Sequence, residues 1–141
     1  MAQLMREDVW RAFIAEGTRT GKLSTVRADG SPHVAPMWFL LDGGDLVFTT
    51  EKETVKARNL LRDDRAALCV DDERPLYSFV VLRGRVGISE EPHLLLTWAT
   101  DIAARYMGDS RAREFGRRNS VPGMLLVRMR IEHVTAYADI A

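Results

Sequence analysis

The sequence predicts a mainly β protein: an antiparallel barrel of at least six strands, with two or three helices at its periphery. Strand-like segments at the start of the chain are separated only by short turns, and a long strand-like run at residues 77–89 carries two glycines. Helical periodicity is confined to separate stretches between these strands. With no internal repeat, low-complexity tract or linker, residues 1–141 are expected to form one domain.

Composition excludes several classes of protein. The formal net charge is zero, whereas a nucleic-acid-binding protein normally has a basic excess. Cys69 is the only cysteine, so no disulfide can form within the chain, and its apolar surroundings at 66–70 predict a buried small side chain. We find no signal-peptide pattern and no apolar run near the roughly 20 residues of a membrane span. We therefore expect a cytoplasmic protein.

The N-terminal third predicts one helix and three strands. Residues 6–16 carry apolar side chains at four-residue spacing, which indicates a helix that ends near Gly17. Residues 21–27 alternate as a strand, residues 28–31 supply a turn around Gly30, and residues 32–41 form the return strand. A second turn at 42–44 leads into a strand at 45–50. Three consecutive strands would form an antiparallel meander.

Pro36 interrupts the second of these strands. Because proline has no N–H, the hydrogen-bonded ladder is expected to break or bulge there. One interpretation is that backbone groups near Met37 and Trp38 then face a ligand. The other is an edge strand with an ordinary bulge, and the residues alone do not separate the two.

The stretch from residue 45 to residue 72 reads as strand, helix and strand. The first strand ends in Thr49 and Thr50, and Lys56, Arg58 and Asn59 lie near the start of a helix at 54–64. Hydroxyls, helix N-terminal N–H groups and a mobile ammonium suit a phosphate group. The alternative is that the threonines simply favour a strand and the lysine is a solvated charge.

The rest of the chain predicts further strands and a helical region. Residues 65–70 form a buried strand, and Gly84 and Gly87 allow the strand at 77–89 to bend or bulge. A helix opens at residues 90–92, carries the apolar stripe Leu95, Trp98, Ile102 and Tyr106, and ends at Gly108. A short helix through residue 115 and one long strand or two at 122–138 complete the chain.

Other chemistries find little support. His33, His93 and His133 lie on different elements without a nearby partner, so no metal site is expected. The chain has no G-x-S-x-G, G-x-G-x-x-G or Walker motif. The basic run at 111–119 is interpreted as a solvated helix face, with an anion contact as a minor alternative.

Several motifs in one order carry a family resemblance. They are T-G-x-L-S-T-V-R-A-D-G-S-P-H-V-A-P-M-W-F, L-V-F-T-T, V-K-A-R-N-L-x-R-D-x-R-A-A-L and R-G-R-V. Together they resemble the pyridoxamine-phosphate-oxidase-like flavin-binding split β-barrels over about residues 5–138. The M-W motif and the K-x-R-N-L run are most similar to the actinobacterial deazaflavin-dependent reductases, which use coenzyme F420.

The resemblance implies a homodimer with two cofactor sites at the subunit interface. Backbone groups of one strand would contact the tricyclic ring, the strand end and lysine would hold the phosphate, and the partner would supply the start of the strand at 77–89. Thr54 stands where related enzymes often have a basic residue, and Lys52 or Arg58 is the candidate replacement. The cofactor-binding residues that the resemblance implies are Pro36, Met37, Trp38, Thr49, Thr50, Lys56, Arg58, Asn59, Tyr77, Ser78 and Phe79.

The implied activity is hydride transfer between F420 and a small organic acceptor with an activated C=C, C=N or C=O bond. No catalytic side chain is assigned. The carboxylate tail of F420 would favour a basic groove, for which Arg58, Arg62 and the arginines of 111–118 are candidates. The alternatives are an FMN-dependent oxidoreductase of the same fold and a non-catalytic protein that binds a flavin, a deazaflavin or haem.

Overall fold

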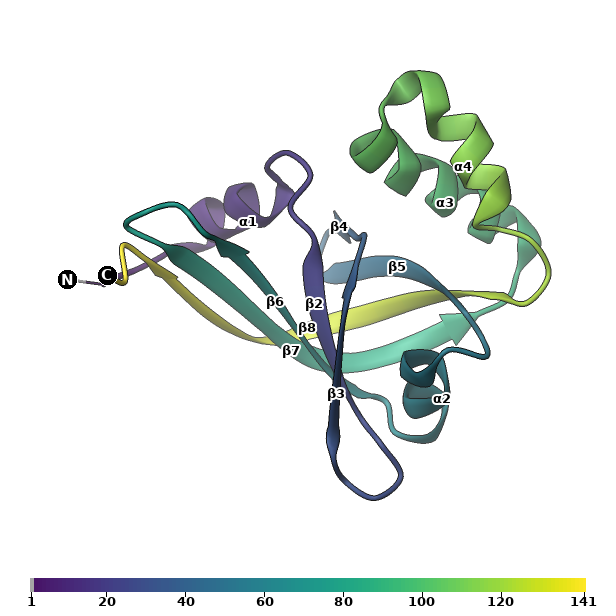
Figure 1. Ribbon diagram of the computed structural model, residues 1–141, viewed down its shortest axis with the longest axis horizontal. Coiled ribbons are helices and arrows are strands. Elements are labelled where there is room, and N and C mark those ends of the chain that lie inside the picture. Colours follow the sequence, from purple (N-terminus) through teal and green to yellow (C-terminus); the bar gives the residue numbers. More distant parts are fainter. Residues whose placement is uncertain (1) are drawn as a thin grey trace.

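The computed structural model describes residues 2–141 and contains eight strands and four α-helices. Figure 1 shows their arrangement, with the two chain ends side by side where β1 pairs with β8. In chain order the elements are β1 (Gln3–Leu4), α1 (Glu7–Ala15), β2 (Gly21–Val26), β3 (Pro32–Met37), β4 (Leu40–Asp42), β5 (Asp45–Glu51), α2 (Val55–Arg62), β6 (Arg65–Asp72), β7 (Ser78–Ser89), α3 (Pro92–Met107), a 3-10 turn (Asp109–Arg111), α4 (Ala112–Arg118) and β8 (Met124–Ala138).

The strands form one antiparallel sheet in the order β3-β2-β6-β7-β8-β5-β4, with β1 added to β8. β3 and β4 therefore lie at opposite edges, yet only Trp38 and Phe39 separate them in the chain. Two residues can join opposite edges only if the sheet curls until its edges approach each other. The two edges are not paired with each other, so the result is a split β-barrel, as the sequence predicts.

The predicted single strand at 32–41 is wrong. The chain leaves the sheet at Trp38 and Phe39 and re-enters at the other edge as β4, so β2, β3 and β5 do not form a meander. The predicted break at Pro36 is also wrong, because Pro36 stays in register opposite Lys22 and the ladder continues to Met37. The physical reason is that β3 is an edge strand, where a position that lacks an N–H can face away from the neighbouring strand.

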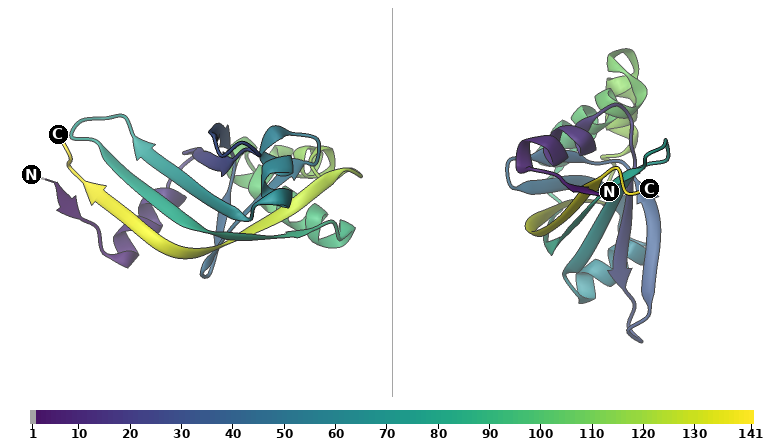
Figure 2. Two further views of the ribbon diagram at one scale, coloured as in Figure 1. Left: turned by 90° about the horizontal axis from the view of Figure 1, so that it is seen from below. Right: turned by 90° about the vertical axis from the view of Figure 1, so that its left-hand side faces the viewer.

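The predicted irregularity in the strand at 77–89 is confirmed. The register between β7 and β8 shifts between Arg83 and Gly84. A Cβ atom at Gly84 would lie 1.8 Å from the carbonyl oxygen of Arg130, so the crossing of these two strands requires glycine. The bulge bends the two longest strands, and the bend is visible in the left panel of Figure 2.

The helices occupy the predicted regions. α2 and α3 begin at side-chain caps: Thr54 accepts a hydrogen bond from the Ala57 N–H, and the Glu91 carboxylate accepts from the N–H groups of His93 and Leu94. α3 and α4 form a hairpin at one end of the sheet, on the right in Figure 1. Within residues 2–141, no helix is long and apolar enough to cross a membrane.

Candidate functional site

A cavity of about 480 Å³ lies where the ends of β3 and β5 and the start of α2 meet the α3–α4 hairpin. It brings together six of the eleven residues predicted to bind a cofactor. Its lining residues are Pro36, Met37, Trp38, Thr49, Thr50, Glu51, Thr54, Lys56, Ile102, Met107, Phe115, Arg118, Asn119 and Met124.

The cavity lies near the two unpaired edges of the sheet. Pro36 and Met37 end the edge strand β3, and Thr49 and Thr50 belong to β5, which lies beside the opposite edge strand β4. Because β3 has no strand beyond it, the outward-facing backbone groups at its end have no ladder partner. These groups are available to the polar rim of a flat ligand.

Thr54 explains how α2 starts beside the end of β5. Its hydroxyl oxygen accepts from the Ala57 N–H at 3.3 Å, donates to the Glu51 carbonyl at 2.8 Å and lies 3.1 Å from the hydroxyl of Thr50. A basic residue could not cap the helix in this way. Thr54 therefore fixes the strand–helix corner, which orients the next residues of α2.

Lys56 is the cation of this corner. Its side chain is half-buried, and burial is the one cause that lowers the pKa of its ammonium below the ordinary 10.5. Among residues 2–141, no carboxylate lies within 4.0 Å of it. A partly desolvated ammonium without a paired carboxylate, in a cavity that Thr49 and Thr50 also line, favours an anionic ligand.

The opposite wall of the cavity is apolar. Ile102, Met107 and Phe115 come from the α3–α4 region and Met124 from the start of β8. Trp38 connects the two walls, since its ring stacks on Tyr106 at 5.2 Å between centroids and meets the Phe115 ring edge-on at 6.4 Å.

Arg118 and Asn119 add polar groups to the cavity lining at the end of α4. The cavity thus offers an apolar, aromatic side and a polar, cationic side. Such a surface suits a ligand with a flat ring and an anionic arm.

The structure does not bring Arg58 and Asn59 into this cavity. Arg58 is exposed and pairs with Glu53 at 2.7 Å. Asn59 is buried beneath α2, where its amide nitrogen donates to the Thr25 hydroxyl at 3.0 Å and its amide oxygen accepts from Arg62 at 3.0 Å. Asn59 therefore fastens α2 to β2.

Tyr77, Ser78 and Phe79 lie at the opposite end of the sheet, near the chain termini (Figures 1 and 2). The Ser78 hydroxyl accepts from the Asp139 N–H at 3.4 Å, and the Phe79 ring lies 6.1 Å from that of Tyr137. Within one chain these residues are remote from the cavity. Their role in a cofactor site stays a prediction that requires a second copy of the chain.

The lining residues from the helical hairpin were not predicted from the sequence. The sequence places Ile102 on an apolar helix stripe and Arg118 on a solvated basic face, with an anion contact as a minor alternative, and the family resemblance adds the arginines of 111–118 only as candidates for a basic groove. The missed lining residues are Glu51, Thr54, Ile102, Met107, Phe115, Arg118, Asn119 and Met124. Only the basic run at 111–119 gives a signal, because no local pattern tells which sheet face a helical hairpin will cover.

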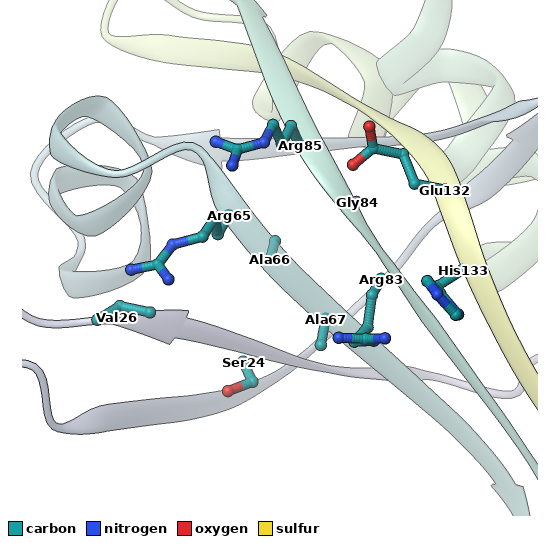
Figure 3. Close-up of a pocket in the computed structure, with 10 residues that line it drawn as sticks. All are labelled: Ser24, Val26, Arg65, Ala66, Ala67, Arg83, Gly84, Arg85, Glu132 and His133. Carbon is teal, nitrogen blue, oxygen red and sulfur yellow. The ribbon is translucent and has the colours of Figure 1, made fainter.

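A second cavity, of about 320 Å³, lies on the outer surface of the sheet (Figure 3). Its base carries the small residues Ala66, Ala67 and Gly84. Arg65 and Arg85 extend from its rim, but Asp63 and Asp64 pair with them, each at 2.7 Å. This cavity contains none of the predicted site residues. Among residues 2–141, no group of three or more metal-ligating side chains is clustered.

Fold and site together define a split β-barrel with an amphipathic cavity at the split. The sequence profile of the family described as pyridoxamine 5′-phosphate oxidase matches residues 7–138, and the chain belongs to this family. No curated protein matches the chain.

Three solved structures illustrate the likeness. A conserved hypothetical protein, Rv2991 from Mycobacterium tuberculosis, is 26% identical with a TM-score of 0.84, over 97% of this chain and 87% of that one. An F420 reductase is also 26% identical, with a TM-score of 0.69, over 88% and 94%. The heme storage protein HutZ of Vibrio cholerae shares the fold alone, at 16% identity and a TM-score of 0.74 over 94% and 96%.

Proposed function

We propose that the chain is an F420-dependent reductase that transfers hydride between F420 and a small organic acceptor with an activated C=C, C=N or C=O bond. The observation that carries the proposal is the half-buried, unpaired ammonium of Lys56, which shares one cavity with Thr49, Thr50 and the β3 end at 36–38. A phosphate at Lys56 and a ring at the β3 end would satisfy both sides of this cavity.

The residues present fit such a cofactor. Thr49 and Thr50 offer polar groups, Lys56 offers a charge-assisted donor, and the backbone carbonyl of Pro36, which faces away from β2 near the end of β3, offers a polar contact to a ring edge. When bound, F420 supplies the hydride chemistry. The chain's own contribution is to bind, to orient and to exclude water, the last through its apolar hairpin wall. We assign no catalytic side chain.

F420 is preferred over FMN because the likeness to an F420 reductase reaches 26% identity over most of both chains. FMN is the alternative cofactor, since it shares the ribityl phosphate that the polar side of the cavity suits. Arg118, at the rim, is the candidate contact for the additional carboxylates of F420.

Direct titration tests the cofactor. Purified protein that is colourless but binds F420 more tightly than FMN in a fluorescence titration supports the proposal, whereas co-purified yellow FMN supports the alternative. Dissociation constants above about 100 μM for both, roughly 5.5 kcal/mol of binding free energy, would overturn the cofactor assignment. Reduced F420 that binds but is not reoxidised by any enone, imine or quinone would favour a carrier over an enzyme.

We further propose a homodimer in which Tyr77, Ser78 and Phe79 of each copy reach the cavity of the other. Light scattering after size-exclusion chromatography measures the mass of the assembly and so tests for a dimer.

Complementation tests the shared site. Lys56→Ala and Tyr77→Ala are each made separately, and the two proteins are then mixed under conditions that exchange subunits. A shared site predicts that mixing restores about half of the tight binding sites in the heterodimers, because one site then carries both changes and the other carries neither. Absence of recovery in verified heterodimers would contradict a shared site.

A further inference from the structure

The bend between β3 and β4 carries Trp38, which lines the cavity, but the bend makes no ladder hydrogen bonds to a neighbouring strand. Trp38 and Phe39 lie between Met37, the last residue of β3, and Leu40, the first of β4. Phe39 is completely buried. Buried backbone N–H and C=O groups require partners, and here no neighbouring strand supplies them.

Two consecutive side chains of α3 supply these partners. The Tyr106 hydroxyl accepts from the Phe39 N–H at 3.3 Å, and the Arg105 Nη1 donates to the Phe39 carbonyl at 2.9 Å. The same hydroxyl donates to the Arg19 carbonyl at 2.8 Å. The last turn of α3 thus replaces the missing ladder partners of Phe39.

The Arg105 guanidinium also donates hydrogen bonds to the end of α1. Its Nη2 donates to the Ile14 carbonyl at 2.7 Å and its Nε to the Gly17 carbonyl at 2.9 Å, at the C-terminal end of α1. Carbonyls at a helix C-terminus carry partial negative charge, so they compensate a guanidinium without a carboxylate. The guanidinium also lies 4.8 Å from the ring centroids of Phe39 and Tyr106.

Neither side chain touches the cavity. Tyr106 lies behind Trp38, with ring planes 2° apart, while Trp38 itself lines the cavity together with Met37. Burial raises the pKa of Tyr106, so its hydroxyl remains protonated and can donate and accept at the same time.

We propose that Arg105 and Tyr106 are positioning residues that set the Met37–Trp38 wall of the cavity for its ligand. They act through Phe39 and the Trp38 ring. This inference rests on the proposed function for the identity of the ligand, but the placement of the bend can be tested without a ligand.

The test compares Tyr106→Phe with Val70→Ala. Tyr106→Phe keeps the ring that stacks on Trp38 and removes only the hydroxyl. Val70 is completely buried in β6 and does not line the cavity, so Val70→Ala is a control for loss of stability. In the free protein, the amide NMR signals of Met37 and Trp38 are expected to move in Tyr106→Phe and to stay in place in Val70→Ala.

With cofactor, the dissociation constant for F420 or FMN is expected to rise about tenfold in Tyr106→Phe, since a displaced wall lowers complementarity. Val70→Ala is expected to bind as the wild type does, even at an equal loss of melting temperature. Arg105→Lys, which keeps the charge but not the three-way geometry, is expected to bind between the wild type and Arg105→Met.

The outcomes separate the two proposals. If the wild type binds neither cofactor, the proposed function fails, and the amide signals alone decide the positioning role. If the signals of Met37 and Trp38 do not move in Tyr106→Phe, the positioning role is overturned. If the wild type binds and Tyr106→Phe binds equally well, the positioning role is likewise overturned while the proposed function stands.

Discussion

The two walls of the cavity are built by different means. The first wall comes from a short stretch of chain, residues 36–56, and combines strand ends, a helix cap and the unpaired Lys56. The second comes from residues 102–124 and is mainly apolar. Hydrogen bonds within the stretch shape the corner between β5 and α2, whereas Arg105 and Tyr106 hold the Trp38 end of the first wall, and the packing of α4 on α3 shapes the second wall. The cationic corner and the apolar hairpin wall can therefore be disrupted separately.

Lys56→Ala is expected to have the largest effect on the first wall. Loss of a charged hydrogen bond should weaken cofactor binding by about 1.5–3 kcal/mol, with little loss of fold because the side chain has no internal partner. Isothermal titration or fluorescence measures the dissociation constant. Arg6→Ala is the matched control, since it removes an exposed positive charge that lies outside the cavity. Unchanged affinity in Lys56→Ala would place the phosphate elsewhere.

Arg58→Ala sharpens the same experiment. The family resemblance implies that Arg58 contributes to binding, but its side chain pairs with Glu53 and does not line the cavity. On the geometry of a single chain, we expect less than about 0.5 kcal/mol change in affinity for such an exposed pair. A loss as large as that of Lys56→Ala would show that ligand or partner binding redirects Arg58.

Gly116→Ala is expected to have the next largest effect, and it acts on the second wall. A Cβ atom at this position would lie 2.2 Å from the Thr100 hydroxyl and 2.8 Å from the Thr100 Cα, so α4 must move off α3. Overpacking of this kind destabilises by about 1–3 kcal/mol, which chemical denaturation measures. Gly44→Ala, which meets no atom within 4 Å, is the control. Equal stability of the two variants would contradict the close contact between α3 and α4.

Asn59→Ala tests how the first wall is fastened to the barrel. Loss of the amide leaves the buried Thr25 hydroxyl without its donor and leaves Arg62 with only the Val26 carbonyl as acceptor, so the free energy of unfolding should fall by about 1–2 kcal/mol. Affinity for the cofactor should fall less than stability does, because Asn59 does not line the cavity. A loss of affinity without any loss of stability would instead support the phosphate contact that the resemblance implies.

Local signals in the sequence predicted much of the first wall. Thr49, Thr50 and Lys56 lie within eight positions of one another, so a strand end and a helix start were enough to bring them together. The same reasoning failed at residues 32–41, because the apolar pattern continues through Trp38 and Phe39 while the chain passes to the other edge of the sheet. What stabilises that bend is Arg105 and Tyr106, more than 60 positions away.

Long-range packing also explains the residues that were misplaced or missed. Lys56 and Asn59 are three positions apart on α2 and suggested a shared role, but one faces the cavity and the other lies beneath the helix against Thr25. Phe115 reaches the cavity because α4 packs on α3, and Met124 because β8 pairs with β5 opposite Glu51. Helical periodicity identifies an apolar face but not its partner.

The smallest expected effect is the pH dependence that Lys56 gives to the first wall. Burial lowers the pKa of this ammonium in the ligand-free protein, and a bound phosphate would raise it again. As the pH rises through the lowered pKa, the free protein loses the proton that binding requires, so affinity should fall.

The free energy of unfolding should change in the opposite sense. Between the lowered pKa and the ordinary 10.5, Lys56 holds its proton more fully in the unfolded chain than in the folded one, so its contribution makes unfolding less favourable as the pH rises. Both slopes are measured as differences between the wild type and Lys56→Met, with Lys22→Met, whose lysine pairs with Asp71, as the control. If affinity and the free energy of unfolding changed with pH in the same direction, Lys56 would not be a half-buried ammonium that recovers its charge when a phosphate binds.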